Sequence, residues 1–243
     1  MTERLAIVAA LEREIRPLVR AWHTREEQHA GRTFRFYENA NTVLICGGIG
    51  SEAARRAAEA IIALYHPTQI YSAGFAGALI LNLRVGDIFV PRRVISAADG
   101  SSVDTGQGDG VLISFSSVAS PEQKTNLAKS YGAQAVDMEA SAVARAAEAR
   151  GIPFAAVKAI SDEHDFALPP MDRFINSNGQ FNSAQFAMFA ALRPWIWGAT
   201  LRLARNSHRA SVTLCRWLEQ VDKSAALTDQ HPVAEAVGSV RQP

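Results

Sequence analysis

Cysteine is scarce in this 243-residue chain, and so is net charge. The two cysteines, Cys46 and Cys215, form no Cys-x-x-Cys spacing, which argues against a disulfide framework and fits a reducing compartment. No apolar run reaches the roughly 18 residues that suggest a transmembrane helix. The formal net charge of +1 gives no overall signal for nucleic-acid binding. We therefore expect a cytoplasmic globular protein that binds no nucleic acid.

Signatures of several catalytic chemistries are also missing. His164 stands among acidic residues, but no His-x-His or His-x-x-x-His spacing supports a metal site. The Gly-x-Ser-x-Gly motif of serine hydrolases does not occur. Residues 48–53 read Gly-x-Gly-x-x-Ala, as in a dinucleotide fingerprint, but the next strand, Gln69–Ala73, ends without the acidic residue that would bind the ribose. We expect neither a metal nor an organic cofactor.

Hydrophobic residues make up 48% of the chain, enough for a packed core, and they alternate between strand-like and helix-like stretches. A hairpin is predicted around Asn39–Asn41. Alternating strands and helices with such a hairpin predict a three-layer α/β/α sandwich with a mixed, twisted central sheet. The predicted strands are Leu5–Ala10, Thr33–Glu38, Thr42–Cys46, Gln69–Ala73, Asp87–Ile95, Val111–Phe115, Gln134–Val136 and Phe154–Ile160. The predicted helices are Glu12–Trp22, Ser51–Tyr65, Pro121–Tyr131 and Ala140–Arg150.

The composition divides the chain into three segments. Residues 1–182 are predicted to form the α/β catalytic domain. Residues 183–222 are predicted to form two or three helices, interrupted near Pro194 and packed on that domain. Residues 223–243 are small and polar, and a mobile tail is expected there.

The middle segment is rich in arginine and aromatic residues. Between Asp172 and Glu219 the chain has six arginines and no acidic residue, with Phe186, Phe189, Trp195, Trp197 and Trp217 interleaved. A basic amphipathic helix with aromatics is typical of contact with an anionic membrane surface. The alternative is an ordinary helix pair with a solvated basic face. A peripheral contact of residues 183–217 with the inner membrane face is therefore one of two hypotheses.

Two short motifs each set a carboxylate where an apolar strand ends. Val136–Ser141 contains Glu139, and Lys158–Asp162 closes the last strand of the domain. Ligands of open α/β sheets bind outside the carboxyl ends of strands, so we expect Glu139 and Asp162 to face one cleft. Helix capping is the alternative for each carboxylate alone. A glycine loop is predicted at Gly74–Ala78. Its glycines would either let the backbone approach a ligand closely or allow tight packing of a strand against a helix.

These motifs resemble, in order, one known family. The run comprises Ala9–Glu14, Gly47–Gly50, Ala73–Gly77, Val85–Val90, Val136–Glu139 and Ala159–Asp162. Over residues 4–165 the chain is similar to the nucleoside phosphorylase and nucleosidase superfamily, above all to methylthioadenosine/adenosylhomocysteine nucleosidases. From Leu168 through the Arg-rich helices it also resembles the hopanoid-associated branch, which is linked to adenine release from adenosylhopane.

The resemblance implies hydrolysis of the N-glycosidic bond of a 5′-substituted adenosine, and a homodimer. Asp162, matching the family's acid, would protonate adenine N7, which requires burial or an adjacent negative charge. Glu14 would activate water, and Glu139 would accept both ribose hydroxyls. The other implied substrate contacts are Met138 on the sugar, Ser161 orienting the acid, and Gly74, Phe75, Ala76, Gly77, Ile49, Val118 and Ala119.

One departure from the family bears on the nucleophile. Phosphorylases of this fold bind phosphate with arginines and a serine in the stretch that corresponds to Ser72–Phe75, and this sequence has neither an arginine there nor a serine at position 75. Lys158 also stands where an arginine is usual. Water is therefore favoured. The alternatives are a phosphorylase that recruits Arg13 or Arg16, and a non-catalytic nucleoside-binding or membrane-surface protein.

Overall fold

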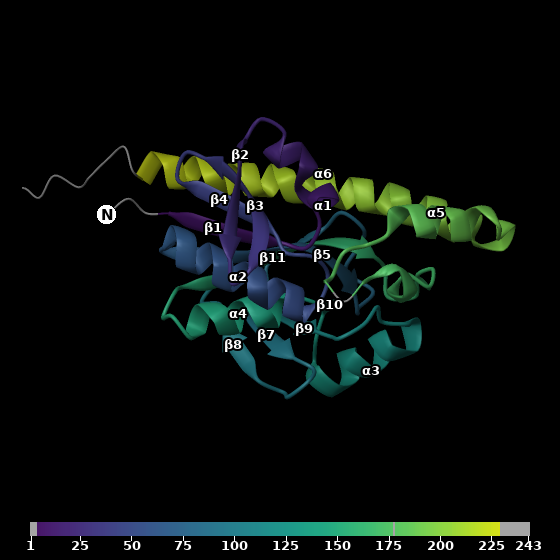
Figure 1. The fold of residues 1–243 in the computed structure, drawn as a ribbon. Coiled ribbons are helices and arrows are strands. Elements are labelled where there is room, and N and C mark those ends of the chain that lie inside the picture. Colours follow the sequence, from purple (N-terminus) through teal and green to yellow (C-terminus); the bar gives the residue numbers. More distant parts are fainter. Residues whose placement is uncertain (1–3, 177, 229–243) are drawn as a thin grey trace, which may run out of the picture.

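The computed structural model describes residues 4–176 and 178–228, and a central sheet separates two layers of helices (Figure 1). Parallel and antiparallel pairs both occur in the sheet, so the predicted three-layer α/β/α sandwich is confirmed. The strands, in sheet order, are β2 (His23–His29), β3 (Arg32–Asn39), β4 (Thr42–Cys46), β1 (Leu5–Ala9), β5 (Gln69–Ala78), β10 (Ala135–Asp137), β9 (Val111–Ser114), β7 (Arg93–Ser96) and β8 (Ser102–Asp104). In addition, β11 (Phe154–Asp162) pairs with β5 and with β6 (Ile88–Phe89).

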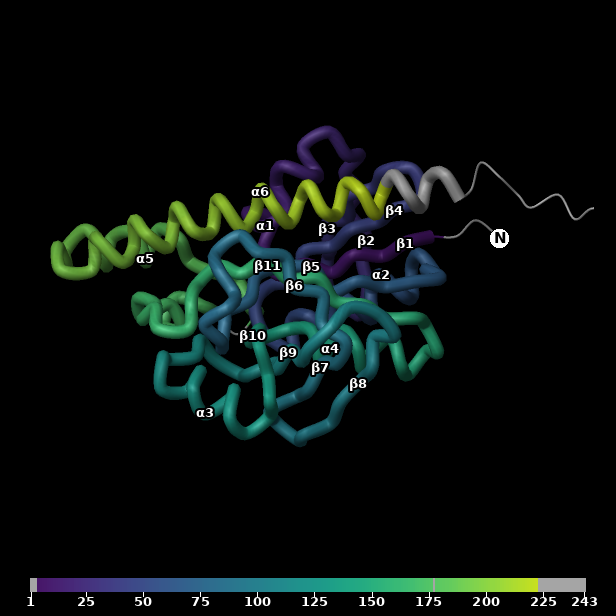
Figure 2. Tube along the Cα trace, turned by 180° about the vertical axis from the view of Figure 1, so that it is seen from behind, coloured from purple at the N-terminus to yellow at the C-terminus, as the bar shows by residue number. Residues whose placement is uncertain are grey.

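Four helices sandwich the sheet. On one face α2 (Ser51–Tyr65) and α4 (Ala140–Glu148) pack together, and their small alanine side chains allow a close approach. On the other face α1 (Glu12–Val19) lies beside α6 (Trp197–Thr228), which runs the length of the molecule (Figure 2). The remaining helices are α3 (Pro121–Tyr131), α5 (Ser183–Ala191), and the short 3-10 turns η1 (Asp172–Phe174) and η2 (Pro194–Ile196).

The long strand β5 positions the functional end of the sheet. β11 runs parallel to it, with Asp162 opposite Gly77, while β10 runs antiparallel to it, with Val136 opposite the same glycine. The carboxyl ends of β10 and β11 therefore converge from opposite directions over the second half of β5. The expected meeting of the two strand ends is found, although β10 is antiparallel to β11 and the two ends do not share one edge.

Several predicted elements need correction. Gly74–Ala78 is no loop, because β10 and β11 flank it and supply ladder partners that keep it in β5. The unpredicted strand His23–His29 has polar residues on both faces, and its pairing with β3 alone defines it. The predicted strand Asp87–Ile95 is interrupted between β6 and β7, where Pro91 lacks the N–H that a ladder needs.

The C-terminal prediction is corrected in part. The helices are interrupted near Pro194, as expected, because η2 separates α5 from α6. However, α6 continues as a helix through residues 223–228, where a tail was expected. The rest of that predicted tail, residues 229–243, lies outside the described residues.

Candidate active site

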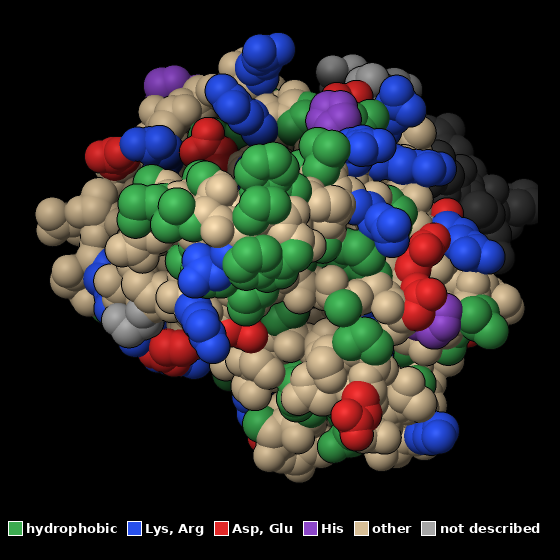
Figure 3. Space-filling model, turned by 90° about the vertical axis from the view of Figure 1, so that its right-hand side faces the viewer, with side chains coloured by type: hydrophobic (Ala, Val, Ile, Leu, Met, Phe, Trp, Pro, Cys, Tyr) green, Lys and Arg blue, Asp and Glu red, His purple; other side chains and the backbone are tan. Residues whose placement is uncertain are grey.

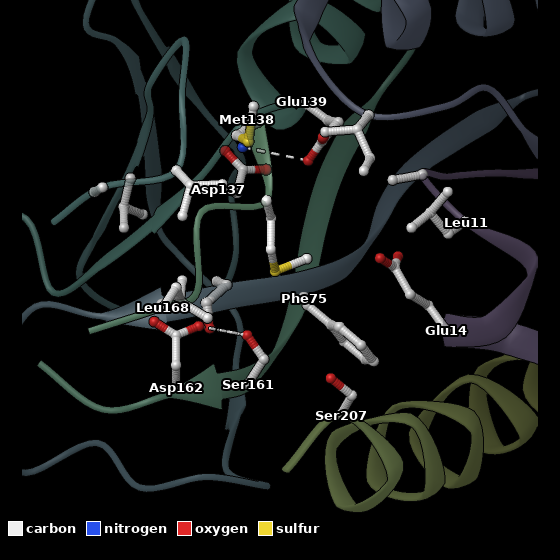
Figure 4. A pocket seen from close by; sticks show the side chains of 18 of the residues that line it. Leu11, Glu14, Phe75, Asp137, Met138, Glu139, Ser161, Asp162, Leu168 and Ser207 are labelled. Carbon is white, nitrogen blue, oxygen red and sulfur yellow. Dashed lines mark hydrogen bonds between the residues drawn. The ribbon is translucent and has the colours of Figure 1, made fainter. Parts of the chain in front are cut away.

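A cavity of about 140 Å³ opens where the ends of β10 and β11 converge (Figure 4). It is lined by every residue of the predicted site except Gly74, which lies behind the wall next to Glu14. Asp162 and Ser161 lie on one side of it, Glu14 lies on the other, and Phe75 lies between them (Figure 4). The predicted residues that line the cavity are Glu14, Ile49, Phe75, Ala76, Gly77, Val118, Ala119, Met138, Glu139, Ser161 and Asp162.

The acid side of the cavity is built around Asp162, which is 3% exposed. Its Oδ1 accepts a hydrogen bond from Ser161 Oγ at 2.6 Å, as expected for an orienting serine. Its Oδ2 forms a buried ion pair with Lys124 Nζ. The burial expected of this acid is therefore present. The adjacent negative charge, which was the other expected way to keep it protonated, is not what it contacts, because its nearest charged neighbour is the cation Lys124. Lys124 also donates to the Glu163 carbonyl at 2.7 Å.

The base side consists of Glu14 in the first turn of α1. It is 5% exposed, so the alternative of a solvated surface charge is wrong. Burial raises the pKa of this carboxyl to about 7, and the negative charge of Glu139 adds to the shift. Within the described residues, Oε2 of Glu14 accepts no hydrogen bond. A Cβ at position 74 would lie 3.0 Å from this oxygen, so Gly74 leaves room for the carboxylate.

Glu139 stands at the start of α4 and is held by backbone groups. Its Oε1 accepts from the Gly50 N–H at 2.8 Å and its Oε2 from the Met138 N–H at 3.2 Å. Burial raises its pKa to about 7, with a further contribution from Asp137. The glycine-rich segment Gly47–Gly50 thus holds the Glu139 carboxylate through the backbone N–H of Gly50.

A buried polar layer supports the site from behind. Asp137 pairs with Lys158 Nζ at 2.8 Å and accepts from Ser114 Oγ at 2.6 Å. Lys158 also donates to Ser72 Oγ at 3.1 Å and is almost completely buried. The lysine that replaces the usual arginine is therefore engaged inside the sheet and does not line the cavity.

A second, larger cavity of about 730 Å³ adjoins the first between α1, α5 and α6. Phe75, Met171 and Leu203 line both cavities, so the two adjoin along these side chains. Its remaining walls are largely apolar near α5, where Phe181 and Phe186 are in ring contact, and basic near α1, where Arg16 and Arg20 lie.

Sequence reasoning missed several lining residues. Lys124 lies in α3 among polar residues and carries no sequence signal for burial. Asp137 belongs to the quoted motif but was given no role. The other unpredicted lining residues are Ala10, Leu11, Ser117, Val136, Leu168, Met171, Ile175, Leu203 and Ser207. Arg13, which was named only for the phosphorylase alternative, also lines the cavity.

Two further findings concern residues 4–176 and 178–228. No cluster of three or more His, Cys, Asp or Glu side chains suited to a metal ion occurs among them. No helix in this part of the chain is long and apolar enough to cross a membrane.

Comparison with known proteins agrees with this geometry. A family model of the phosphorylase superfamily matches residues 4–119 and 107–191. The chain belongs to the phosphorylase superfamily. It is 25% identical over 200 residues to a 5′-methylthioadenosine/S-adenosylhomocysteine nucleosidase of Buchnera aphidicola, with 67% of this chain and 86% of the relative covered. It is 24% identical over 224 residues to an aminodeoxyfutalosine nucleosidase of Helicobacter pylori, with 76% and 96% covered.

Solved structures of the superfamily share the fold. A futalosine hydrolase of Helicobacter pylori superposes with a TM-score of 0.69 at 19% identity, covering 92% of this chain and 99% of that one. A nucleosidase of Neisseria meningitidis in complex with methylthio-immucillin-A gives a TM-score of 0.68 at 19% identity, covering 91% and 99%. The expected resemblance to the nucleosidases of this superfamily is thereby confirmed.

Proposed function

We propose that the chain is a purine nucleosidase that hydrolyses the N-glycosidic bond of a 5′-substituted adenosine and releases adenine. The observation that carries the proposal is a pair of buried carboxylates, Asp162 and Glu14, on opposite sides of one cavity. The named activities of the relatives, which are nucleosidases, support the same reaction.

The reaction divides between the two sides of the cavity. Breaking the C1′–N9 bond leaves an oxocarbenium-like sugar, and its electron pair departs with adenine, which leaves well only when N7 is protonated. Asp162 faces the base and delivers that proton. Glu14 takes a proton from the water that attacks C1′. Glu139 accepts from the ribose hydroxyls, and Met138 packs against the sugar.

Water is the proposed nucleophile, and phosphate is the alternative. Phosphate needs charge-assisted donors, and Lys158, the cation behind the Ser72–Phe75 stretch, is neutralised by Asp137. Arg13 lines the cavity, but its guanidinium lies over the Phe181 ring at 5.2 Å. These contacts favour hydrolysis over phosphorolysis.

Purified protein tests the reaction directly. Incubation with 5′-methylthioadenosine or S-adenosylhomocysteine should release adenine at the same rate with and without phosphate, and the sugar product should be free. Ribose 1-phosphate in proportion to added phosphate would establish the phosphorylase alternative. Binding of these nucleosides without any adenine release would instead support the non-catalytic alternative.

The finer assignment concerns the 5′ substituent. A methylthio group would fill only a small part of the adjoining cavity of about 730 Å³, whose walls include Phe181, Phe186 and Leu203. These dimensions and the resemblance to the hopanoid-associated branch support adenosylhopane as substrate. Adenine release from adenosylhopane at a higher kcat/KM than from 5′-methylthioadenosine would support it, and the reverse preference would refute it.

A peripheral membrane contact is proposed for the same end of the molecule. Trp195 is 77% exposed and Trp197 is 55% exposed, so neither is buried against the body of the protein. Burial of both in a dimer contact stays the alternative. Figure 3 shows this end, with hydrophobic side chains gathered on the surface and Lys and Arg near them. The exposed large hydrophobic residues of this region are Met188, Leu192, Trp195, Trp197 and Leu201.

Liposome sedimentation tests that contact. Aromatic residues favour the membrane interface, and each nearby basic residue adds about 1 kcal/mol on an anionic surface. The protein should bind anionic liposomes at low salt and dissociate as salt rises, and Trp195→Ala with Trp197→Ala should weaken binding. Absence of binding at low salt would rule the contact out and leave an enzyme that works away from membranes.

A cytoplasmic homodimer completes the proposal. Most apolar residues of α2 are buried in the chain's own core, and Leu64 is 37% exposed. The outer face of α2 instead carries ion pairs of Arg55 with Glu52 and Glu59 at 2.8 and 2.6 Å. A dimer would therefore use this charged face or another surface. Light scattering after size exclusion measures the mass and decides between one chain and two.

A further inference from the structure

Lys124 is a charged group that lines the cavity and contacts the proposed acid Asp162, yet the reaction above gives it no role. Its side chain is 2% exposed, although it belongs to a helix whose neighbouring positions are polar. Its ammonium group contacts two acceptors, Asp162 Oδ2 and the Glu163 carbonyl. It also lines the cavity itself, so it stands within the proposed base-binding side.

A purely structural role explains this lysine poorly. Burying an ammonium and a carboxylate is costly, and well-packed apolar side chains of similar volume often stabilise a protein as well or better. The chain also makes room for the pair, because a Cβ at Gly77 would lie 2.8 Å from Asp162 Oδ2 and 3.2 Å from Lys124 Cε. Retaining a buried pair at a cavity wall points to use in the reaction.

The pair also raises a question of proton supply. Both oxygens of Asp162 accept hydrogen bonds, one from the Ser161 hydroxyl and one from the Lys124 ammonium. A carboxylate accepts such bonds with both oxygens and has no proton of its own to give. The proton for adenine N7 must then come from a neighbour, and Lys124 is the cation in contact with this carboxylate.

We propose that Lys124 is the proton source of the reaction and acts through Asp162, an inference that rests on the proposed nucleosidase function. As the C1′–N9 bond breaks, one proton passes from Lys124 Nζ to Asp162 Oδ2, and Asp162 gives one proton to N7. The bonding electron pair stays with adenine. Water forms the new bond to C1′, and its proton goes to Glu14. Exchange with solvent then removes the proton from Glu14 and restores the ammonium of Lys124.

Lys124→Ala tests the proposal through chemical rescue. Loss of a general acid lowers the rate by about 10²- to 10⁴-fold, so adenine release should fall by that range. The truncation removes the side chain beyond Cβ, and added methylamine or ethylamine should restore turnover in a concentration-dependent way. Guanidinium is the matched control, because it carries the same charge but does not release a proton near neutral pH.

Two further measurements separate proton supply from folding or positioning. Lys124→Arg keeps the cation and should be as slow as the alanine variant. A substrate with the same sugar and a 4-nitrophenolate leaving group needs no protonation, so Lys124→Ala should cleave it within a few-fold of the wild-type rate. That result would also show that the variant is folded. If Lys124→Ala does not fold, Lys124→Met, of similar volume, takes its place.

The outcomes are distinct. Rescue by amines but not by guanidinium supports the proposal. Equal rescue by both, or a Lys124→Arg enzyme as fast as wild type, would reduce Lys124 to a positioning charge and overturn the proposal. Equal losses on the adenosine and on the activated substrate would overturn it as well. Failure of the wild-type enzyme to release adenine would instead refute the underlying function.

Discussion

The two sides of the cavity use a carboxyl group for opposite tasks, giving a proton on one side and accepting a proton on the other. On the acid side, Asp162 ends a strand and has both oxygens occupied by Ser161 and Lys124. On the base side, Glu14 lies in a helix turn, and its Oε2 has no hydrogen-bond partner among the described residues. A carboxylate held by two hydrogen-bond partners is oriented to transfer a proton to one atom of the substrate. A buried carboxylate with a free oxygen is raised in pKa and ready to accept a proton.

Burial alone does not set the role of a carboxylate. Both side chains are at most 5% exposed. Their neighbours differ, since Asp162 meets a cation and Glu14 faces the negative charge of Glu139. Pairs of carboxylates in contrasting environments are how one site supplies an acid and a base at the same pH.

The largest expected effect is on the acid side. Asp162→Asn should lower the rate of adenine release by about 10²- to 10⁴-fold, because it interrupts proton transfer to the leaving base. Steady-state kinetics with 5′-methylthioadenosine measures this. Asp99→Asn is the matched control, since Asp99 pairs with Arg145 on the surface and should be neutral. Activity of Asp162→Asn within a few-fold of wild type would exclude Asp162 from the reaction.

On the base side, Glu14→Gln should cost about 10²-fold or more, because the amide cannot accept the proton of water. Glu14 works only when ionised, and its pKa is raised to about 7. In the wild type, kcat/KM should therefore fall as pH drops below about 7. Glu14→Gln should lose the part of that limb that is due to Glu14, and any limb that remains would come from Glu139, whose pKa is also raised to about 7. Glu12→Gln, an exposed glutamate of the same turn, should keep the wild-type profile.

The same two substitutions should move stability in opposite directions. Glu14 has a folded pKa above the ordinary value of 4.5, so its ionisation destabilises the fold as pH rises from about 4.5 through about 7. At pH 8, Glu14→Gln should raise the free energy of unfolding by up to about 3 kcal/mol, and at pH 4 it should have little effect. Asp162→Asn leaves Lys124 buried without its counter-charge and should lower the free energy by about 3–5 kcal/mol.

Urea titrations at pH 4 and pH 8 measure both changes. A shift of the same sign for the two variants at pH 8 would contradict the contrast between the two sides. The double variant Asp162→Asn with Lys124→Met buries no unpaired charge. It should therefore recover part of the free energy of unfolding that Asp162→Asn alone loses.

The smallest effects are expected at two glycines. A Cβ at Gly77 would lie 2.8 Å from Asp162 Oδ2, and the ion pair with Lys124 holds that oxygen in place. A Cβ at Gly74 would lie 3.0 Å from Glu14 Oε2, which has no hydrogen-bond partner among the described residues. Gly77→Ala should lower kcat by about 10- to 100-fold through misplacement of the acid. Gly74→Ala should have the smaller effect, since Glu14 can shift. The opposite ranking, measured by the kcat of both variants, would mean that the acid side is the more adaptable one.

Much of the fold followed from local pattern. The helix Ser51–Tyr65 was predicted with its observed bounds, because its alanines favour helix and Gly50 and His66 end it on either side. The strand His23–His29 was missed, because only its partner β3 makes it a strand. The segment Gly74–Ala78 was misread, because glycine favours loops locally and ladder partners from distant sequence overrule that preference.

Local sequence placed Glu139 and Asp162 after apolar strands and so predicted that they share a cleft, and the family resemblance added Glu14 to it. The charges and partners of these carboxylates follow only from the folded chain. The sequence around Lys124 is typical of a surface lysine, but in the folded chain it is buried and pairs with Asp162, 38 positions away. Likewise, the second cavity exists because α6 returns across α1. Local propensity is encoded within a few residues, whereas burial, ion pairing and cavity shape depend on contacts between distant segments, which only the folded chain brings together.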